Sequence, residues 1–311
     1  MPKTVPERGF NLPPTAVNDY RPVFFPALLP DRADLLLAIR AFHDAEGDSR
    51  LLCVNTRTFE TRVLRAGQLA YRRESGAGAP GYFTDAEIQR TPYRRALVHA
   101  TEAPSPLSNG GLTHAQQPVN GAFLTVDLCP SVAPFERAFF ERLLALSSTR
   151  QQPLALAVAV SGLWLMAHRQ AFAWLQQLRR AERLAITWIN HATTHLYLPD
   201  LPLAQNFLLH PSQRMGDEVL ALERLLLLAG ETPSVFFRYP GLVSDEAHMA
   251  RLAALGLIPV GADAWLAHGE LAANGAIVLV HGNGNEPRGI ALALEILTCF
   301  EWLPLTRALA A

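Results

Sequence analysis

From Gly121 to the end of the chain, short apolar runs rich in β-branched residues alternate with helical stretches of about 10 to 16 residues. The predicted strands cover residues 122–128, 154–160, 184–189, 234–238, 257–262 and 276–281. Strands that are apolar on both faces are typical of a parallel sheet covered by helices, because a sheet with one wet face alternates apolar and polar residues. This part of the chain therefore predicts an α/β fold.

The segments between these strands carry helix signals. Phe135, Phe139, Leu143 and Leu146 recur at helical spacing, which indicates one amphipathic helix. Two further predicted helices, 215–229 and 245–255, are each followed by glycine, the residue that best adopts the left-handed conformation at a helix C-terminus. The regular alternation of strand and helix thus supports the α/β class.

Residues 1–118 lack this regular alternation of strands and helices, and seven prolines lie within the first 30 residues. We expect one helix at residues 32–44 and short strands at 50–54 and 61–64. A stretch of Pro, Ser, Asn, Gly and Gln at residues 102–119 is typical of a linker or a long surface loop. We therefore expect an N-terminal α+β segment of unknown role at 1–118 and a barrel domain at 119–311.

Composition excludes several functions. The 27 basic and 28 acidic residues give a net charge of −1, so no overall field favours a nucleic acid. Lys3 is the only lysine, which excludes Schiff-base chemistry, pyridoxal phosphate and the P-loop lysine. Three scattered cysteines are too few for a disulfide framework or a structural zinc site. No run is long and apolar enough for a membrane span, and residues 1–10 lack the apolar core of a leader.

Polar side chains gather at the C-terminal ends of the predicted strands. They are Asp127, Ser161, His191, His195, Arg238, Asp263 and His281. In a parallel (β/α) barrel these ends meet on one face, where the loops build the active site. The sequence therefore predicts one polar site made from six segments of the chain.

His191 and His195 are spaced i, i+4. On a helical turn the two imidazoles would share a face and could bind one ion at about 2.0–2.1 Å per nitrogen. A pair of this kind can also be a solvated helix face. Its position after a strand, with a carboxylate, an arginine and a third histidine at equivalent positions, favours a metal site.

Five segments in this half of the chain carry a family resemblance. They are residues 125–130 (TVDLCP), 190–195 (NHATTH), 237–241 (FRYPG), 263–265 (DAW) and 279–281 (LVH). In order and approximate spacing they resemble the five motifs of the polysaccharide deacetylases, the NodB-type carbohydrate esterases, over residues of about 120–308. That family has a distorted or incomplete (β/α) barrel, in agreement with the alternation of strands and helices.

The resemblance implies a metal-dependent hydrolase that removes N-acetyl, less often O-acetyl, groups from an acetylated glycan. His191 and His195 match the residues that hold a divalent ion, usually zinc. Asp127 matches the general base, and Arg238 matches the arginine that orients this base. Members of the family act mostly outside the cytoplasm, so the resemblance suggests a periplasmic or secreted location.

The resemblance also implies how the leaving group and the sugar are handled. His281 matches the general acid that protonates the departing amine, and Asp263 matches the carboxylate that tunes this histidine. Trp265 and Tyr239 are the residues that we expect to stack on a sugar ring, although each could instead pack in the core.

One position departs from the family pattern. The full first motif has two adjacent aspartates, a base followed by a metal ligand, and Leu128 occupies the second position. Three interpretations follow: Asp127 itself completes the site with His191 and His195, the two histidines hold the ion with help from Cys129 or a loop residue, or the site is inactive. We expect the first, and we interpret Cys129 as a small apolar filler.

Two other functions stay open beside the deacetylase. An inactive relative would keep the barrel and bind a glycan or a protein, as the leucine at position 128 allows. A barrel with two histidines and a carboxylate could also hydrolyse another small substrate at a C–N bond.

Overall fold

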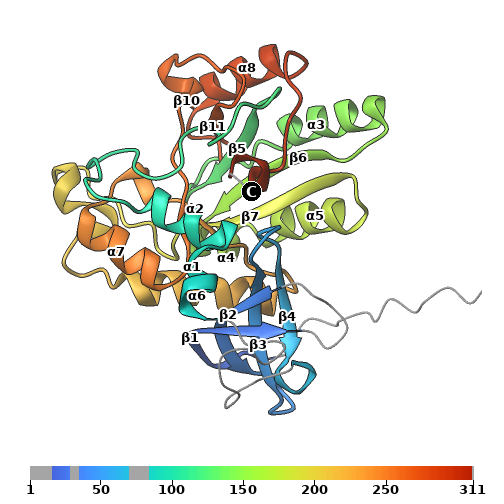
Figure 1. Cartoon of the computed structure of the whole chain (residues 1–311). Coiled ribbons are helices and arrows are strands. Elements are labelled where there is room, and N and C mark those ends of the chain that lie inside the picture. The colour runs from blue at the N-terminus through green and yellow to red at the C-terminus, as the bar shows by residue number, and fades with distance from the viewer. Residues whose placement is uncertain (1–15, 29–34, 70–83, 310–311) are drawn as a thin grey trace, which may run out of the picture.

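The computed structural model describes residues 16–28, 35–69 and 84–309, which form two sheets. The larger sheet has seven strands, all of whose pairings are parallel, in the order β10-β11-β5-β6-β7-β8-β9 (Figure 1). Its strands are β5 (Phe123–Leu128), β6 (Leu154–Val160), β7 (Leu184–Asn190), β8 (Phe236–Phe237), β9 (Ile258–Pro259), β10 (Ala264–Trp265) and β11 (Ile277–His281). The predicted α/β class is confirmed, and all six predicted strands contain an observed one.

The two outer strands of this sheet, β9 and β10, are nearly continuous in the chain. Since β9 pairs with β8 and β10 pairs with β11, the sheet curls until its edges approach each other, which makes an incomplete barrel. The seam is covered by residues that the sequence predicts as linker or surface loop. Leu112 exchanges backbone hydrogen bonds with Pro259 and Gly261 across it.

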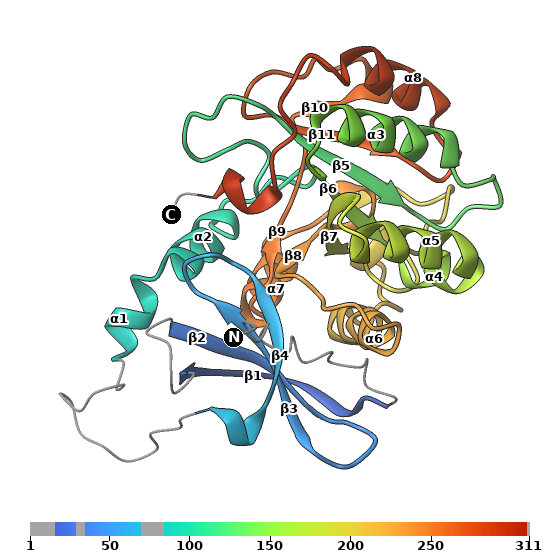
Figure 2. The ribbon, with the colours of Figure 1, turned by 90° about the vertical axis from the view of Figure 1, so that its right-hand side faces the viewer.

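Helices cover the outer face of this sheet (Figure 2). They are α3 (Arg137–Arg150), α4 (Gly162–Ala167), α5 (Arg169–Arg180), α6 (Met215–Leu228) and α8 (Pro287–Ile296). Alternate strand residues such as Val126, Leu128 and Val158 point into the cluster beneath these helices. Leu128 is therefore a core residue, fully buried. No helix in the described part of the chain has the length and apolarity needed to cross a membrane.

The smaller sheet is antiparallel, with the order β1-β2-β3-β4. Its strands are β1 (Asn18–Leu28), β2 (Leu35–His43), β3 (Ser49–Asn55) and β4 (Thr61–Arg65). The helix predicted at 32–44 is wrong, because its described residues form the central strand β2. Leu36 and Ala38 face one hydrophobic cluster while Leu37 and Ile39 face another, so the run lacks the alternation that identifies a strand.

The N-terminal segment shares a core with the barrel. One hydrophobic cluster joins Leu37 of β2 and Tyr93 of α2 (Pro92–Ala100) to Phe123 and Ile189 on the inner face of the large sheet. The short helix α1 (Asp85–Gln89) contributes Ile88 to the same cluster. The segment is α+β, as predicted, and the division at residue 118 stays a prediction.

A buried ion pair ties the small sheet to α6. Both nitrogens of Arg40 that face Glu223 donate to its carboxylate, at 2.7 and 2.9 Å, and neither side chain is exposed. The remaining Arg40 nitrogen donates to the carbonyl oxygens of Ile39 and Leu255. Tyr20 on β1 donates to the same carboxylate. Each charged group is therefore surrounded by partners, as a buried pair requires.

The remaining helix, α7 (Glu246–Ala254), packs beside α6 and β9. Its observed bounds lie inside the predicted helix 245–255, and α6 agrees with the predicted 215–229 to within one residue. Gly256, which follows α7, has φ of +71°, as expected for a left-handed position after a helix.

Candidate functional site

A cavity of about 880 Å³ opens at the C-terminal ends of the parallel strands. Four of the predicted polar site residues line it together: Asp127, His191, His195 and His281. Strand register explains part of this meeting, since His281 at the end of β11 lies directly opposite Asp127 on β5. The predicted convergence of polar side chains on one face of the barrel is therefore present.

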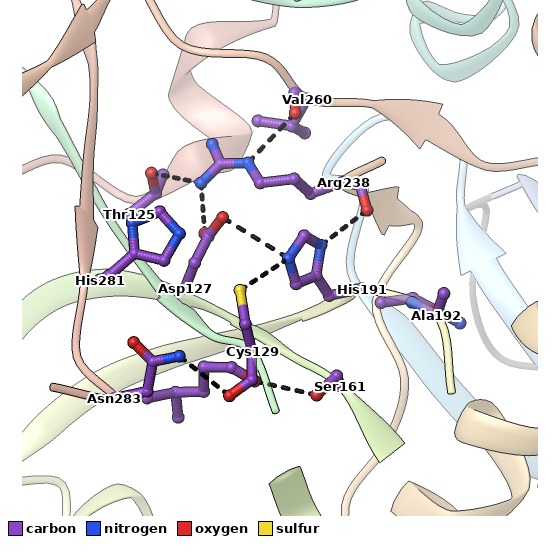
Figure 3. A network of polar contacts seen from close by, with 12 residues as sticks. Thr125, Asp127, Cys129, Ser161, His191, Ala192, Arg238, Val260, His281 and Asn283 are labelled. Atoms are coloured by element: carbon purple, nitrogen blue, oxygen red, sulfur yellow. Dashed lines mark hydrogen bonds and ion pairs between the residues drawn. The ribbon is translucent and has the colours of Figure 1, made fainter. Parts of the chain in front are cut away.

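Asp127 is fixed by a fully buried arginine (Figure 3). Arg238 donates from Nη1 to Asp127 Oδ1 at 2.6 Å and to Thr125 Oγ1 at 2.8 Å. Its other nitrogens donate to the carbonyl oxygens of Val260 and Gly261. Because these contacts use every nitrogen of Arg238, the guanidinium is locked and orients one carboxylate oxygen of Asp127, leaving Oδ2 to face the cavity side.

His191 and His195 lie on a loop, so the prediction that they share a helical turn is wrong. The chain leaves β7 at Asn190 and passes through left-handed backbone positions at Ala192 (φ +61°) and His195 (φ +50°). These turns bring the two rings together edge to face, with centroids 4.7 Å apart. The pair therefore converges as expected, but by means of a strained loop.

A glutamate on α6 holds this loop in place. Glu218 accepts hydrogen bonds from the backbone nitrogens of Thr193 and Thr194 at 2.9 and 2.7 Å. Asn190 accepts another from Ala192 N at 3.0 Å. Sequence reasoning missed Glu218, because nothing in its local sequence points to a loop 24 residues earlier.

The ring nitrogens of the two histidines have distinct environments. His191 Nδ1 lies 2.9 Å from the carbonyl oxygen of Arg238, which can only accept, so Nδ1 carries a proton. In the neutral ring Nε2 then carries no proton and has a free lone pair. This nitrogen lies 3.4 Å from Cys129 Sγ and 3.7 Å from Asp127 Oδ2. His195 Nε2 is buried and has no hydrogen-bond partner among the described residues.

Cys129 lies at the centre of the site, which corrects its interpretation as an apolar filler. Its ligand atom and those of His191 and His195 all lie within 4.8 Å of one another, and it forms a second such group with Asp127 and His281. Burial would raise the pKa of the Cys129 thiol, but the neighbouring His195, His191 and His281 lower it well below its ordinary value. The three histidines therefore favour the thiolate form of Cys129 over the thiol.

The same surroundings shift the titration of His191. Burial would lower the pKa of its imidazole, but the neighbouring Cys129 and Asp127 reverse this effect and raise it above the ordinary value. Anionic neighbours therefore favour a positive charge at this point of the cavity.

His281 is held by Glu286, not by Asp263 as the resemblance implies. Glu286 Oε2 lies 2.8 Å from His281 Nδ1 and also accepts from Trp265 Nε1 at 2.8 Å. Burial would lower the pKa of His281, but Cys129, Glu286 and Asp127 raise it well above the ordinary value. Glu286 immediately precedes the first residue of α8, and no sequence motif marks it.

Asp263 lies elsewhere and does not line the cavity. Its carboxylate pairs with His114 and accepts a hydrogen bond from the backbone nitrogen of Ile277. Ile277 starts β11 whereas His281 ends it, a separation of about 13 Å along an extended strand. The expected contact between Asp263 and His281 is therefore replaced by one at the opposite end of the strand.

Two aromatic pairs flank the cavity. Trp265 stacks on His268, with ring centroids 3.9 Å apart, and Tyr197 stacks on Phe207 at 5.3 Å. Trp265 thus lines the cavity as predicted, and Tyr197, which is 56% exposed, is an aromatic residue that sequence reasoning missed. Tyr239 is 3% exposed and packs against Phe237 in a separate cluster, so it does not offer a stacking surface.

Comparison with known proteins gives no match to any protein-family model. Among solved structures, a family 4 carbohydrate esterase from Bacillus anthracis has a TM-score of 0.45 and 15% identity, covering 63% of this chain and 86% of its own. The chitin deacetylase of Colletotrichum lindemuthianum has a TM-score of 0.44 and 18% identity, covering 65% and 92%. A family 4 pseudoenzyme, also from Bacillus anthracis, has a TM-score of 0.43 and 12% identity, covering 95% and 91%. These likenesses are loose, so the chemistry of the site has to be derived from its own side chains.

Proposed function

We propose that this chain is a metal-dependent hydrolase that removes acetyl groups from the amide nitrogen of a glycan. One observation carries the proposal: the ligand atoms of His191, His195 and Cys129 all lie within 4.8 Å of one another, and Cys129 forms a second such group with Asp127 and His281. Asp127 is fixed by Arg238, and His281 is fixed by Glu286. A proton acceptor, Asp127, and a proton donor, His281, therefore both line the cavity. The five sequence motifs supply the expectation of an acetylated sugar as substrate.

The residues present fit a divalent ion. His195 Nε2 is buried and has no hydrogen-bond partner in the described part of the chain, and His191 Nε2 faces Cys129 Sγ and Asp127 Oδ2. Imidazole and thiolate are ligands that zinc prefers, so zinc is the ion that we expect. When bound, such an ion polarises a carbonyl group and lowers the pKa of water.

Asp127 is suited to accept a proton. Arg238 holds Oδ1, and Oδ2 is left on the side of His191, 3.7 Å from its Nε2. Because Arg238 is buried and bonded through all its nitrogens, the carboxylate cannot rotate away from this position. We therefore assign Asp127 as the general base.

His281 is suited to donate a proton to the departing amine. The carboxylate of Glu286 faces His281 Nδ1 and stabilises the imidazolium, and Cys129, Glu286 and Asp127 raise the pKa of His281 above its ordinary value, which favours the proton-donating form. Its place opposite Asp127 puts base and acid on neighbouring strands. One group can then take a proton from water while the other gives one to the leaving nitrogen.

The cavity has room for a sugar. Its volume of about 880 Å³ lies within the range of about 300–1,000 Å³ that is common for ligand sites. Trp265 and Tyr197, which both line the cavity, are aromatic rings of the kind that pack against apolar faces of sugars.

The test combines metal analysis with acetate release. Purified protein is expected to contain close to one zinc ion per chain and to release acetate from chitin oligomers or peptidoglycan fragments, and chelator treatment should abolish this release until zinc is restored. His195→Ala should lose both metal and activity, whereas Asp217→Asn on the exposed side of α6 should keep both. Acetate release that is unchanged after complete removal of metal would contradict the proposal.

A second candidate function is a hydrolase that uses Cys129 as its nucleophile. Cys129, His281 and Glu286 follow one another as thiol, imidazole and carboxylate, the order of a cysteine nucleophile with its base and orienting group. In that case the thiolate would attack the acyl carbon, the amine would leave with the proton of His281, and water would hydrolyse the thioester. This candidate gives no role to His191 and His195, which is why we favour the metal. It predicts activity in chelator and an acyl adduct on Cys129 by mass spectrometry.

A further inference from the structure

Resting on the metal-dependent function proposed above, we infer that the thiolate of Cys129 is the third protein ligand of the ion. The site would then be Cys-His-His and would select zinc, cobalt(II) or cadmium over the harder ions magnesium and manganese.

Strand geometry puts position 129 on the ligand side. Side chains alternate across a strand, so Asp127 and Cys129 face the cavity while Leu128 between them faces the outer core. A leucine at 128 therefore does not remove the third ligand from the site. The residue available as the third metal ligand is instead the next one in the chain, Cys129.

The distances suit a tetrahedral ion. Cys129 Sγ and His191 Nε2 lie 3.4 Å apart, and zinc–sulfur and zinc–nitrogen bonds of about 2.3 and 2.0–2.1 Å at a tetrahedral angle place these atoms about 3.6 Å apart. The ligand atom of His195 lies within 4.8 Å of both. In the described residues Asp127 forms no such three-membered group with the two histidines, so Cys129 fits the third position better.

The three atoms also present lone pairs to the same space. In the neutral ring His191 Nε2 carries a lone pair, because its Nδ1 proton points to Arg238 O, and His195 Nε2 has no partner among the described residues. A cation bound by the sulfur and the two ring nitrogens would give each of these buried atoms a partner. Asp127, in contrast, already has its partner in Arg238.

The backbone around the thiol is anchored from two sides. Asn283, fully buried, donates to the carbonyl oxygen of Cys129 at 2.9 Å, and Ser161 donates to that of Leu128 at 3.1 Å. These contacts come from the segments that follow β11 and β6. A ligand positioned by such neighbouring hydrogen bonds binds a metal without a large rearrangement.

The chemical class of the ion follows from the ligands. Thiolate and imidazole bind zinc and its analogues well, whereas magnesium, manganese and calcium prefer oxygen ligands. Replacing the sulfur by a carboxylate should therefore widen the site toward manganese. Cys129→Asp tests this directly, since it gives the chain an oxygen ligand at the same position.

Cobalt(II) absorption tests the ligand itself. Chelator-treated full-length protein titrated with cobalt(II) should develop an intense near-ultraviolet thiolate-to-cobalt charge-transfer band that saturates at one ion per chain. Cys129→Ser should lose this band and bind zinc at least about 100-fold more weakly, more than the loss of a hydrogen-bond partner of a ligand usually costs. Cys299→Ser, at an exposed cysteine outside the cavity, should keep the band.

The outcomes separate this inference from the proposed function. Bound cobalt with visible d–d bands but no charge-transfer band would overturn the cysteine ligand and leave the metal-dependent hydrolase intact. Failure of wild type to bind cobalt or zinc, with acetate release persisting in chelator, would overturn both. If Cys129→Ser does not fold, Cys129→Asp replaces it: a folded variant with no charge-transfer band and a manganese affinity above that of wild type supports the inference, and an unchanged band contradicts it.

Discussion

Two buried clusters of charged and polar groups differ in one respect. In the pair of Arg40 and Glu223 every nitrogen of the arginine donates to an acceptor, and neither group is exposed. At the strand ends, His195 Nε2 has no partner among the described residues, and His191 Nε2 faces Cys129 and other acceptors. A buried polar group whose hydrogen-bond partners all belong to the protein stabilises the fold. A buried polar group that lacks such a partner is available to bind a ligand.

The largest effect should come from breaking the satisfied cluster. Glu223→Gln leaves the guanidinium of Arg40 buried without its counter-charge, and we expect the free energy of unfolding to fall by about 3–5 kcal/mol. Metal content and kcat of the folded protein should not change. Denaturant unfolding followed by circular dichroism measures this, with Glu60→Gln at an exposed ion pair as control. Equal stability of the two variants would show that the pair does not hold the fold.

Breaking the incomplete cluster should affect rate instead. His281→Ala removes the proposed proton donor opposite Asp127, and we expect kcat to fall by about 100-fold or more. The midpoint of thermal unfolding should change little, because the partner of His281, Glu286, keeps contact with Trp265 and with water. Stopped assays of acetate release with zinc-loaded protein test this. Full activity in the variant would remove His281 from the mechanism.

Completing the second cluster should stabilise the chain. Zinc at about 100 times its dissociation constant is expected to raise the free energy of unfolding by about 2.7 kcal/mol, because the unfolded chain binds it poorly. Glu223→Gln should show the same increase as wild type, since the two clusters share no residue, and His195→Ala should show none. Thermal unfolding with and without zinc gives both values. An increase that survives in His195→Ala would place the ion elsewhere.

The smallest effect concerns the rim of the cavity. Tyr197→Ala removes one aromatic face, and we expect KM for chitin oligomers to rise about two- to tenfold with kcat unchanged, in line with about 0.5–1.5 kcal/mol for an aromatic contact. Tyr197→Phe keeps the ring and should behave as wild type. A fall in kcat at constant KM would mean that Tyr197 acts on the reacting groups.

Much of the barrel could be predicted from sequence because a strand that is buried on both faces has a continuous run of apolar residues. These runs predicted β5, β6 and β7 to within a residue. A similar run at residues 32–44 predicts a helix, although it contains β2, an inner antiparallel strand that is also buried on both faces. The location of the site followed from strand ends, since the ends of parallel strands meet.

The identity of some site residues could not be predicted from motifs. Alternation along β5 could have indicated Cys129, because it lies two residues after Asp127 and hence on the same side. Glu286 and Glu218 carry no such signal. They reach His281 and the histidine loop only through the placement of α8 and α6, which depends on packing across the whole outer face.

Helix α6 carries both Glu218 and Glu223, five residues apart, which is about 7.5 Å along a helix axis. Glu218 accepts hydrogen bonds from the backbone of the loop that carries His191 and His195, and Glu223 pairs with Arg40 in the small sheet. One short helix thus fixes both the histidine loop and the small sheet, so the relative position of these two parts of the fold is set by a single rigid element.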